Sequence, residues 1–358
     1  MKLSVHLVTW NGAKYVPHLL YSLRHQTFTD WTLRIFDNAS GDAMMEKMRE
    51  QIQDFPVPVE CIQNATNSGF AGGHNTLFRT MGDAEYFLCL NQDMYLEPDC
   101  FEKLVRFLDT HKNVAAASPR LMKWNFSVLE NDKAGMDGVY SDQIDSLGLK
   151  VFRNRRVIEQ HGQEVWSQIQ NKFQNDWIEV FGVSGALPIF RSSAMKNIAF
   201  EDGSFFDESY HSYKEDVDIA FRLRSVGYSA CIVLSAVAFH DRSAAGPKEL
   251  NDHSALKNKQ KQSEWVKYHS YKNHLMTLYK NEYWQNVLLD FFPILWYEGK
   301  KFVYFLFFDR KVLSGWKAIW NMRKSLQRKN KFLHEKRQIS VPVESIPAGW
   351  KRIRKWWT

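Results

Sequence analysis

Apolar and polar positions alternate regularly over the first 120 residues of the chain. Short apolar runs predict strands over 3–10, 59–64 and 86–90, and a strand followed by a turn over 31–40. Between them, apolar residues recur at helical spacing, which predicts helices over 13–26, 41–53 and 72–82. Repeated strand–helix units of this length are typical of an α/β protein with a mostly parallel, doubly wound sheet flanked by helices.

The pattern loosens after this region. A polar stretch over 123–177 carries glycines and mixed charges, so we expect an excursion from the core there. Regular structure is expected again as strands within 177–191, a helix over about 215–226 and a strand over 229–239. After a polar segment over 244–264, the remaining chain has the pattern of helices.

These patterns predict an α/β domain over 1–245 and a mostly helical extension over 246–358. The chain has 358 residues, 44% of them apolar, which is enough for a large core and an appendage. The four cysteines are scattered without a CxxC pair, which favours reduced thiols and a cytoplasmic protein. The N-terminal residues enter a strand directly and lack the features of a signal peptide, so we expect no export.

The positive charge is concentrated at the C-terminal end. The net charge is +7, but residues 300–358 carry 16 Lys and Arg against 3 Asp and Glu, or +13, which leaves −6 for residues 1–299. Residues 287–308 are aromatic and apolar, yet charges and Pro293 interrupt them. No run of about 18 apolar residues exists, so we expect no membrane-spanning helix.

This combination predicts a helix that lies peripherally on an anionic membrane, at its inner face. A nucleic-acid surface would use the same charge. The aromatic and aliphatic content favours the membrane, so we expect no nucleic acid among the partners. A solvated basic tail and an oligomer contact are the remaining alternatives, and the oligomeric state is open.

Polar side chains follow the predicted strands, at the edge where parallel α/β sheets bind ligands. Asn91, Gln92 and Asp93 come directly after the strand at 86–90, with Asn91 and Asp93 on one face and Gln92 on the other. A carboxylate there can hold Mg²⁺ or Mn²⁺ while a phosphate fills other coordination positions. The alternative is a simple turn with an Asx hydrogen bond.

His240 and an acidic cluster supply further candidates. His240 follows the strand at 229–239 and is either a metal ligand or an ordinary surface histidine. Glu215, Asp216 and Asp218 fall in the first turn of a predicted helix, where the helix dipole favours carboxylates. Capping and an Asp218–Arg222 pair explain part of the cluster. At least one acid is therefore a candidate general base.

A glycine-rich segment, with Gly69, Gly72 and Gly73, precedes another predicted helix. Glycines there permit close backbone approach to a phosphate or a ribose. The spacing matches neither GxGxxG nor GxxxxGKS, so it does not indicate a dinucleotide or P-loop site.

Seven stretches in chain order resemble bacterial glycosyltransferase family 2, which has the GT-A fold, and most of all its rhamnosyltransferase-type members. They are VTWNG (8–12), FDNASGD (36–42), NSGFAGGHN (67–75), LNQDMYLEP (90–98), EVFGVSGALPIFRSSA (179–194), FDESYHSYKEDVDIAFRLRSVGY (206–228) and VAFHDRS (237–243). Each stretch is a weak signal alone, but seven in register over residues 1–245 are specific.

The resemblance implies a donor part and a metal part of one site. Residues implied to bind the donor nucleotide are Thr9, Asn11, Asp37, Asn67, Gly69, Asn91 and Gln92. Asp93 corresponds to the last acid of the family's DXD motif and would hold the metal together with His240. Asn91 agrees with the family's alternative Asn-Pro-Asp form, while Gln92 departs from it and lacks the fixed backbone angle of proline.

The resemblance also implies an inverting single displacement with Asp216 as the catalytic base. Asp216 would take a proton from an acceptor hydroxyl, whose oxygen attacks the anomeric carbon opposite the nucleoside diphosphate. The metal would neutralise the departing diphosphate. Ser184, Gly185 and Glu215 are implied on the acceptor side, where Glu215 either binds the acceptor or caps its helix. Arg222 and Arg224 are expected to pair with the acids.

The substrates are expectations from the same resemblance. It favours dTDP-rhamnose as the donor, while UDP sugars suit the same type of pocket. The acceptor would be a saccharide, free or linked to polyprenyl diphosphate, in the assembly of a cell-surface polysaccharide such as O-antigen. It is expected to lie against 123–177 and 182–186.

Two other classes of protein are weighed against this hypothesis. A non-catalytic nucleotide- or glycan-binding module of the same fold is disfavoured because both Asp93 and Asp216 are present. A sugar-1-phosphate nucleotidyltransferase would carry arginine and lysine in a glycine-rich loop after the first strand. The stretch VTWNGAKYV offers only Lys14.

Overall fold

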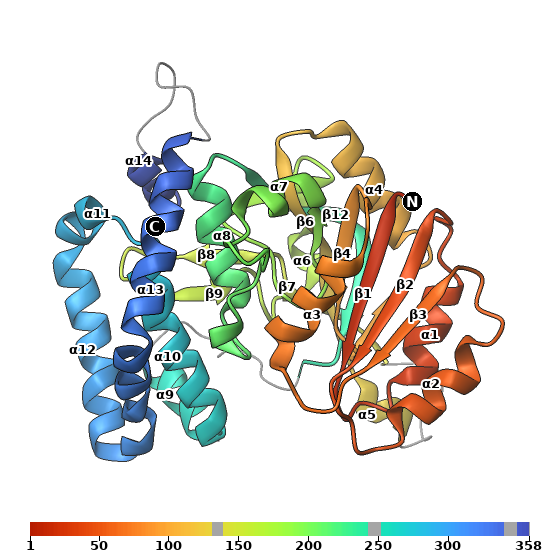
Figure 1. The fold of residues 1–358 in the computed structure, drawn as a ribbon, viewed down its shortest axis with the longest axis horizontal. Coiled ribbons are helices and arrows are strands. Elements are labelled where there is room, and N and C mark those ends of the chain that lie inside the picture. The colour runs from red at the N-terminus through yellow and green to blue at the C-terminus, as the bar shows by residue number, and fades with distance from the viewer. Residues whose placement is uncertain (131–138, 243–251, 340–348, 358) are drawn as a thin grey trace.

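The computed structural model describes residues 1–130, 139–242, 252–339 and 349–357. A twisted sheet with helices against it forms one part of the molecule, and the C-terminal helices lie beside it (Figure 1). The fold is therefore α/β with a helical C-terminal region, as the sequence predicts. The predicted boundary between 245 and 246 lies outside the described residues.

Four parallel strands and their connecting helices form the first half of the sheet. The strands β1 (Leu3–Thr9), β2 (Trp31–Asp37), β3 (Val59–Gln63) and β4 (Tyr86–Leu90) lie in the order β4-β1-β2-β3. The connections contain α1 (Val16–Arg24), α2 (Met44–Ile52) and α3 (Gly69–Thr80). The predicted strand–helix units are thus confirmed, and the carboxyl ends of these strands meet at one edge.

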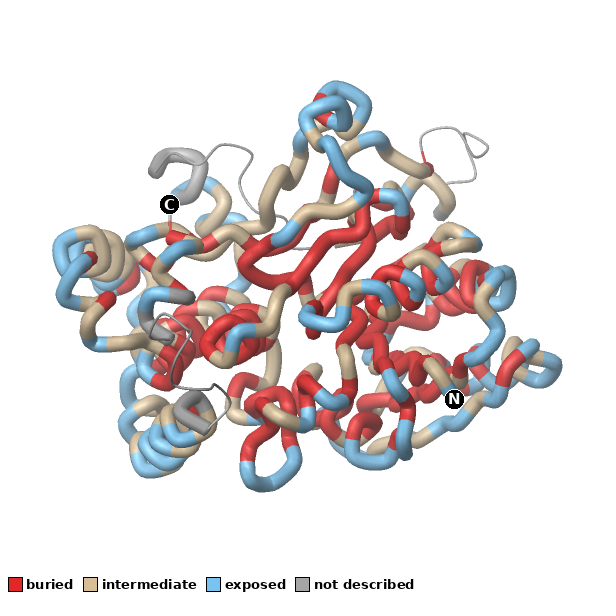
Figure 2. Tube along the Cα trace, turned by 90° about the horizontal axis from the view of Figure 1, so that it is seen from above, coloured by how far each residue is buried: buried red, intermediate tan, exposed pale blue. Residues whose placement is uncertain are grey.

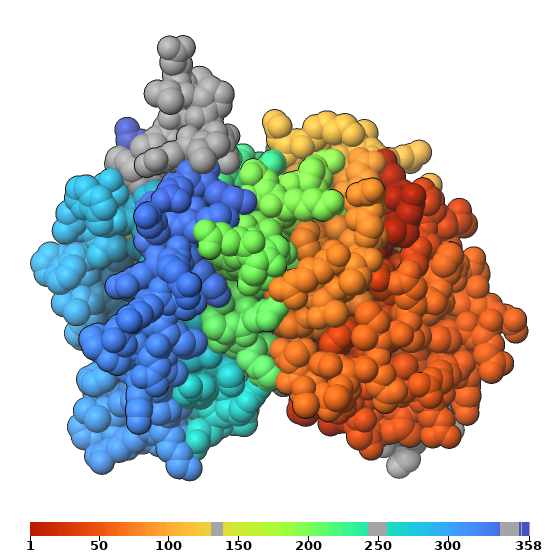
Figure 3. All heavy atoms as spheres, viewed as in Figure 1, coloured from red at the N-terminus to blue at the C-terminus, as the bar shows by residue number. Residues whose placement is uncertain are grey.

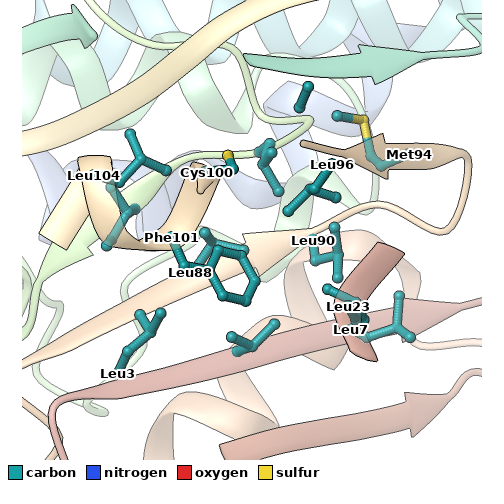
Figure 4. Close-up of a cluster of buried hydrophobic side chains, with 14 of the residues drawn as sticks. Leu3, Leu7, Leu23, Leu88, Leu90, Met94, Leu96, Cys100, Phe101 and Leu104 are labelled. Carbon is teal, nitrogen blue, oxygen red and sulfur yellow. The ribbon is translucent and has the colours of Figure 1, made fainter. Parts of the chain in front are cut away.

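The strand β4 lies at the centre of the core and is buried along its whole length. Leu88 and Leu90 pack on one face of the sheet with α1 and α4 (Cys100–Thr110), as Figure 4 shows. Phe87 and Cys89 pack on the other face with α3 and α7 (Ser192–Ile198). A strand covered by helices on both faces needs apolar residues throughout, which explains the unbroken run in the sequence.

The second half of the sheet completes the ligand edge. β6 (Val114–Trp124) and β12 (Ser229–His240) are parallel neighbours, and β11 (Ile189–Arg191) runs antiparallel between β6 and β4. β10 (Trp177–Val180) pairs with the other side of β12, so the strands predicted within 177–191 are confirmed. The short strand β5 (Met94–Leu96) pairs with the end of β12, where Met94 faces His240.

The excursion predicted over 123–177 contributes more to the core than expected. β7 (Tyr140–Ser146) pairs with β6, and β8 (Leu149–Val151) and β9 (Val157–Glu159) form a hairpin. Two short helices, α5 (Phe126–Glu130) and α6 (Trp166–Ile169), flank these strands. The segment buries Val139, Ile144, Leu147, Leu149 and Val151. The sequence did not predict this core because the segment has mixed charges, which are typical of exposed loops. In the structure several of these charges are paired inside the protein.

The C-terminal region is helical, as predicted. Its helices are α9 (Asp252–Lys261), α10 (Glu264–Asn281), α11 (Trp284–Leu289), α12 (Phe291–Phe308), α13 (Ser314–Ile339) and α14 (Gly349–Arg354). Within the described ranges, no helix combines the length and the apolar character needed to cross a bilayer. The sheet is deeply buried, whereas these helices carry long exposed stretches (Figure 2).

The C-terminal region packs tightly against the α/β core. Ile353, next to α8 (Glu215–Ser225), lies in one apolar cluster with Phe221. The buried ammonium of Lys280 on α10 lies 2.5 Å from Asp207 and 3.0 Å from Asp218. Figure 3 shows α13 lying directly against the segment around α8. The helices therefore hold the loop that leads into α8, rather than forming a loose appendage.

Candidate active site

The predicted donor residues at the ends of β1 and β2 lie together. Thr9 and Asp37 are paired in register, and the Thr9 hydroxyl donates to Asp37 Oδ1 at 3.1 Å. Asp37 Oδ2 accepts from the backbone N–H of Ser40 at 3.2 Å. Asn11 has a left-handed backbone, with φ of 48°, and its Oδ1 accepts from the Gly41 N–H at 2.8 Å. These bonds fix the loops after β1 and β2 against each other.

Gln92 binds the backbone of Trp10 with both ends of its side-chain amide. The Trp10 N–H donates to Gln92 Oε1 at 2.9 Å, and Gln92 Nε2 donates to the Trp10 carbonyl at 3.0 Å. A Cβ atom on Gly12 would lie 2.2 Å from Gln92 Cδ, so a larger residue at position 12 would displace this amide. Gln92 thus positions the loop after β1. Its nucleotide contact, and that of the neighbouring Asn91, stay predictions.

The glycine-rich segment packs against a distant loop. The Gly69 N–H donates to Asn67 Oδ1 at 2.8 Å, and Gly69 has φ of 75°. A Cβ atom on Gly69 would lie 2.4 Å from the His211 carbonyl oxygen, so this backbone approach requires glycine. Asn38 ties the same segment to β2 by accepting from the Ser68 N–H at 2.7 Å. Asn38 stands inside the FDNASGD stretch, but its role was missed.

Asp93 and His240 converge, as the sequence predicts. The pairing of β5 with β12 brings the end of β4 beside the end of β12. His240 Nε2 then lies 3.4 Å from Asp93 Oδ1. In the described part of the chain, no group of three His, Cys, Asp or Glu side chains is arranged to hold a metal ion. The described side chains thus bring the two predicted ligands, Asp93 and His240, close together and add no third ligand of these types.

The other nitrogen of His240 is held by Asp145 on β7. His240 Nδ1 lies 2.9 Å from Asp145 Oδ2. Burial opposes the charged imidazole, but the carboxylates of Asp93 and Asp145 outweigh it and raise the pKa of His240 to about 9. Asp145 was missed because it comes from the excursion, and only the pairing of β7 with β6 brings it here.

Arg242 connects the metal pair to the acceptor side. Its guanidinium lies 2.9 Å from Asp145 and 2.9 Å from Glu159, and it donates to the Ser184 hydroxyl at 3.1 Å. The Ser184 hydroxyl also lies 3.2 Å from Glu159 Oε1. The predicted acceptor-side residue Ser184 is thus part of a charged network. Arg242 lies two residues after His240 in the stretch VAFHDRS. Its place in this stretch is the sequence feature that could have identified it as a site residue.

Asp216 lies at the far end of this network. It is half-buried in the first turn of α8, and its Oδ2 accepts from the Gly185 N–H at 3.3 Å. Burial first, and then the charge of Glu159, raise the pKa of Asp216 above its usual range. The second oxygen of Asp216 accepts from the Val217 N–H at 2.8 Å. The structure therefore brings Asp216, Gly185 and Ser184 together.

The loop before Asp216 is strained and is held by the C-terminal region. The backbone φ values of His211, Tyr213 and Lys214 are 66°, 73° and 72°, and residues other than glycine rarely adopt such values. Asn273 on α10 donates to the carbonyls of Tyr210, Ser212 and Tyr213 at 3.1, 2.8 and 2.8 Å. This amide fixes the direction from which Asp216 enters α8.

The neighbouring acids have different surroundings. Asp218 is buried and paired with Arg222 at 3.0 Å and with Lys280, so it is a structural residue. Arg224 pairs instead with Glu179, at 2.6 Å, so the expected pairing with the acidic cluster is confirmed for Arg222 and wrong for Arg224. Glu215 is buried, and its Oε1 has no hydrogen-bond partner among the described residues. Burial raises the pKa of Glu215 to about 8.

A cavity of about 850 Å³ opens beside Asp216. The region from β7 to β9, the segment from Tyr213 to Val217, and the helices α9, α10 and α12 line it. Glu215 is absent from the described lining, so its acceptor contact stays a prediction. The excursion forms a wall where the acceptor is expected. The contribution of the C-terminal helices was missed, because no local motif marks them.

Parts of the chain are similar in sequence to known proteins. Residues 4–194 match the family described as Glycosyl transferase family 2. The poly(ribitol-phosphate) beta-N-acetylglucosaminyltransferase TarS of Staphylococcus aureus is 29% identical over 116 residues, which are 31% of this chain and 19% of TarS. The match therefore spans about a fifth of that relative.

Two solved structures share the fold. Residues 1–349 of S. aureus TarS in complex with UDP superpose with a TM-score of 0.51 at 15% identity, over 99% of this chain and 90% of that one. GalNAc-T7 with UDP, GalNAc and Mn²⁺ has a TM-score of 0.55 at 12% identity, over 79% of this chain and 49% of that one. At such low identity these similarities show the fold alone, and they agree with the GT-A expectation.

Proposed function

The chain belongs to glycosyl transferase family 2, and we propose that it moves a sugar from a nucleotide-diphosphate donor to a hydroxyl of a saccharide acceptor. One observation carries this proposal. A continuous network runs from Asp93 through His240, Asp145 and Arg242 to Ser184, beside the Gly185 N–H that contacts Asp216. The network joins a candidate leaving-group site to a candidate base.

The donor set at Asp93 and His240 fits a divalent cation. Two neighbouring ligands that are each about 2.1 Å from an octahedral ion lie about 3.0 Å apart, so Asp93 Oδ1 and His240 Nε2, which are 3.4 Å apart, would need only a small inward shift to share one ion. Asp145 holds the second nitrogen of His240, as outer partners of metal-bound histidines do. When bound, Mg²⁺ or Mn²⁺ supplies positive charge against the diphosphate leaving group.

Asp216 is proposed as the general base of an inverting displacement. Its raised pKa makes the carboxylate a better proton acceptor at neutral pH. The oxygen of the acceptor hydroxyl attacks the anomeric carbon, the bond to the diphosphate breaks, and the proton passes to Asp216. The hydrogen bond from Gly185 and the adjoining network fix the direction of the carboxylate, which is how positioning raises the rate.

Two observations support different identities for the donor nucleotide sugar. The sequence resemblance favours dTDP-rhamnose. The name of the S. aureus relative supports a UDP-linked N-acetylglucosamine instead. Both sugars belong in the first binding experiment.

The acceptor is proposed to be a saccharide or a polyprenyl-diphosphate-linked saccharide at the cytoplasmic face of the membrane. Support comes from the surface of the C-terminal region, where large apolar side chains of α11, α12 and α13 are exposed, among them Trp284, Phe292, Trp296 and Trp320. Lysine and arginine side chains lie along α13. Apolar side chains with many cations suit an anionic membrane surface. The four unpaired cysteines agree with a reducing compartment.

A thermal-shift panel of nucleotide sugars, with and without Mn²⁺, tests the proposal. A ligand that binds the folded protein raises its apparent stability. We expect one nucleotide sugar to raise the Tm in a Mn²⁺-dependent way, followed by transfer to a saccharide. Mn²⁺-dependent binding without any transfer would support a non-catalytic module. No shift with any nucleotide sugar would contradict a donor site at this edge.

A further inference from the structure

The cavity beside Asp216 has one wall of mixed charge and one cationic wall. The wall from the excursion and the segment at α8 has mixed charge. It includes Asp145, Glu159 and Asp216 of the network already described, and also Lys123, Arg156, Lys214 and Arg242. The wall from α9, α10 and α12 carries Lys259, Lys267, Lys300 and Lys301. No carboxylate from these three helices is among the described lining residues. A ligand in this cavity therefore meets the candidate base Asp216 on one side and four lysines on the other.

Lys259 on α9 is less compensated than Lys267 and Lys301 of that wall. Lys301 pairs with Glu298 at 3.0 Å and Lys267 pairs with Asp309 at 3.0 Å, whereas Lys259 has no ion-pair partner in the described ranges. Its ammonium lies 4.5 Å from the centre of the Phe305 ring. Burial first, and then the charge of Lys301, lower the pKa of Lys259 to about 7. An anion in the cavity would offset the repulsion between Lys259 and Lys301.

The helix α12 separates the cationic wall from an exposed apolar surface. Tyr297, Lys301 and Tyr304 face the cavity. On another face of the same helix, Phe292, Trp296 and Phe307 are 79%, 70% and 70% exposed. A helix with its side chains is about 10 to 12 Å thick. A molecule with an anionic head and a hydrocarbon tail can therefore reach both surfaces at once.

Building on the proposed function, we propose that the cationic wall binds a phosphate group of the acceptor, with Lys259 as its principal contact. Phosphate esters are strong acceptors of charge-assisted hydrogen bonds from ammonium groups. The apolar face of α12 favours a lipid-linked phosphate as its source. A soluble phosphate ester shares the same chemistry, and the experiment separates the two sources.

Vesicle binding by the full chain tests this site. The vesicles are phosphatidylcholine alone, phosphatidylcholine with a polyprenyl phosphate, and phosphatidylcholine with phosphatidylglycerol. We expect Lys259→Gln to weaken binding to polyprenyl-phosphate vesicles about tenfold, as the loss of one charge-assisted contact predicts. Lys259→Arg keeps the charge and should retain binding. The exposed Lys331→Gln removes the same charge elsewhere on the C-terminal helices and should have little effect.

The outcomes distinguish the site from general attraction. Equal binding of wild type and Lys259→Gln to polyprenyl-phosphate vesicles would overturn the inference, as would equal losses in Lys259→Gln and Lys331→Gln. Glycerol phosphate, added in solution, competes only if the cavity accepts a soluble phosphate ester. Competition that disappears in Lys259→Gln would support the phosphate site and assign it a soluble source. Competition that persists unchanged in that variant would count against the site.

The inference and the proposed function fail separately. Lys259 lies on the acceptor side, so Lys259→Gln should retain Mn²⁺-dependent nucleotide-sugar binding. The protein could bind a nucleotide sugar and transfer the sugar to a neutral saccharide, yet bind neither polyprenyl-phosphate vesicles nor glycerol phosphate. In that case the phosphate site is wrong and the glycosyltransferase proposal stands. If no nucleotide sugar binds, the proposed function itself is wrong.

Discussion

The donor side and the acceptor side of the candidate site are assembled in different ways. The donor side uses residues that directly follow β1, β2 and β4, so the parallel sheet alone brings them together. The acceptor side combines the β8–β9 hairpin, the loop before α8 and three C-terminal helices, which no strand register connects. Strand-end motifs are therefore enough to locate a donor site, while an acceptor cavity exists only after long-range packing.

The two sides also differ in what stabilises them. The donor loops are joined by hydrogen bonds, and those between Gln92 and the Trp10 backbone are neutral. The acceptor side is held by buried ion pairs, such as Lys280 with Asp218 and Asp290 with Arg155. Breaking a buried ion pair leaves a charge without compensation, which is more costly than losing a neutral hydrogen bond.

Asp216→Asn separates the two sides most sharply. The amide cannot accept the proton, so the rate of transfer should fall by about 10²- to 10⁴-fold, which is the usual contribution of a general base. Donor affinity should stay unchanged because the donor loops do not include this residue. Single-turnover transfer and donor titration measure the two effects. Near-normal transfer by the variant would exclude Asp216 as the base.

Lys280→Met tests the ion pairs that hold the acceptor side. The variant leaves Asp207 and Asp218 buried with less compensating charge, so the free energy of unfolding should fall by about 3 kcal/mol. Urea unfolding measures this loss. Lys331→Met, which removes an exposed lysine paired only at 3.8 Å, should change stability by less than about 0.5 kcal/mol. Similar losses in the two variants would show that the buried pairs do not stabilise this side.

Glu215→Gln tests, through the pH dependence of stability, the buried acid beside the proposed base Asp216. Burial raises the pKa of Glu215 from its ordinary value of 4.5 to about 8, so the folded protein retains a proton that the unfolded chain releases. The stability contributed by this group is complete below pH 4.5 and is lost as the pH rises toward 8. The substituted glutamine does not titrate. The free energy of unfolding of the variant should therefore rise relative to that of wild type by about 1.4 kcal/mol per pH unit in this window. Parallel pH profiles of urea unfolding for the two proteins would contradict a buried, protonated Glu215.

Gln92→Ala should have the smallest effect and should act on the donor side. It removes two hydrogen bonds to the Trp10 backbone, which predicts a loss of about 1 kcal/mol in stability and about tenfold weaker donor binding as the loop loosens. Asn91→Ala serves as the comparison because its side chain makes no hydrogen bond in the described part of the chain. A loss of stability in Asn91→Ala equal to that in Gln92→Ala would contradict the clamp. Calorimetric donor titration also tests the predicted contact of Asn91 with the nucleotide.

The sequence was informative where chemistry follows a strand directly. The strand ends at Asp37, Asp93 and His240 were predicted because apolar runs show where strands finish and parallel strands share one ligand edge. The helix that begins at Glu215 was predicted as well, because its apolar spacing and its acidic first turn are local signals. These predictions needed no knowledge of how distant segments pack.

The remaining parts of the site could not be predicted from local patterns. Asp145 and Glu159 stand among other charges in the excursion, and nothing in their neighbourhood shows that they face Arg242. Asn273 acts through hydrogen bonds to the loop before α8, which is distant in the sequence. The pKa of Lys259 depends on Lys301, which is also distant in the sequence. Long-range contacts of this kind are set by tertiary structure and leave no periodic signal in the sequence.

The most direct test of the account is a calorimetric titration of the donor nucleotide diphosphate with and without Mn²⁺, in wild type, Asp93→Asn and Asp216→Asn. We expect Mn²⁺ to strengthen binding to wild type and to Asp216→Asn equally, and to have little effect on Asp93→Asn. An undiminished Mn²⁺ effect in Asp93→Asn would contradict a metal-dependent donor site at Asp93 and His240.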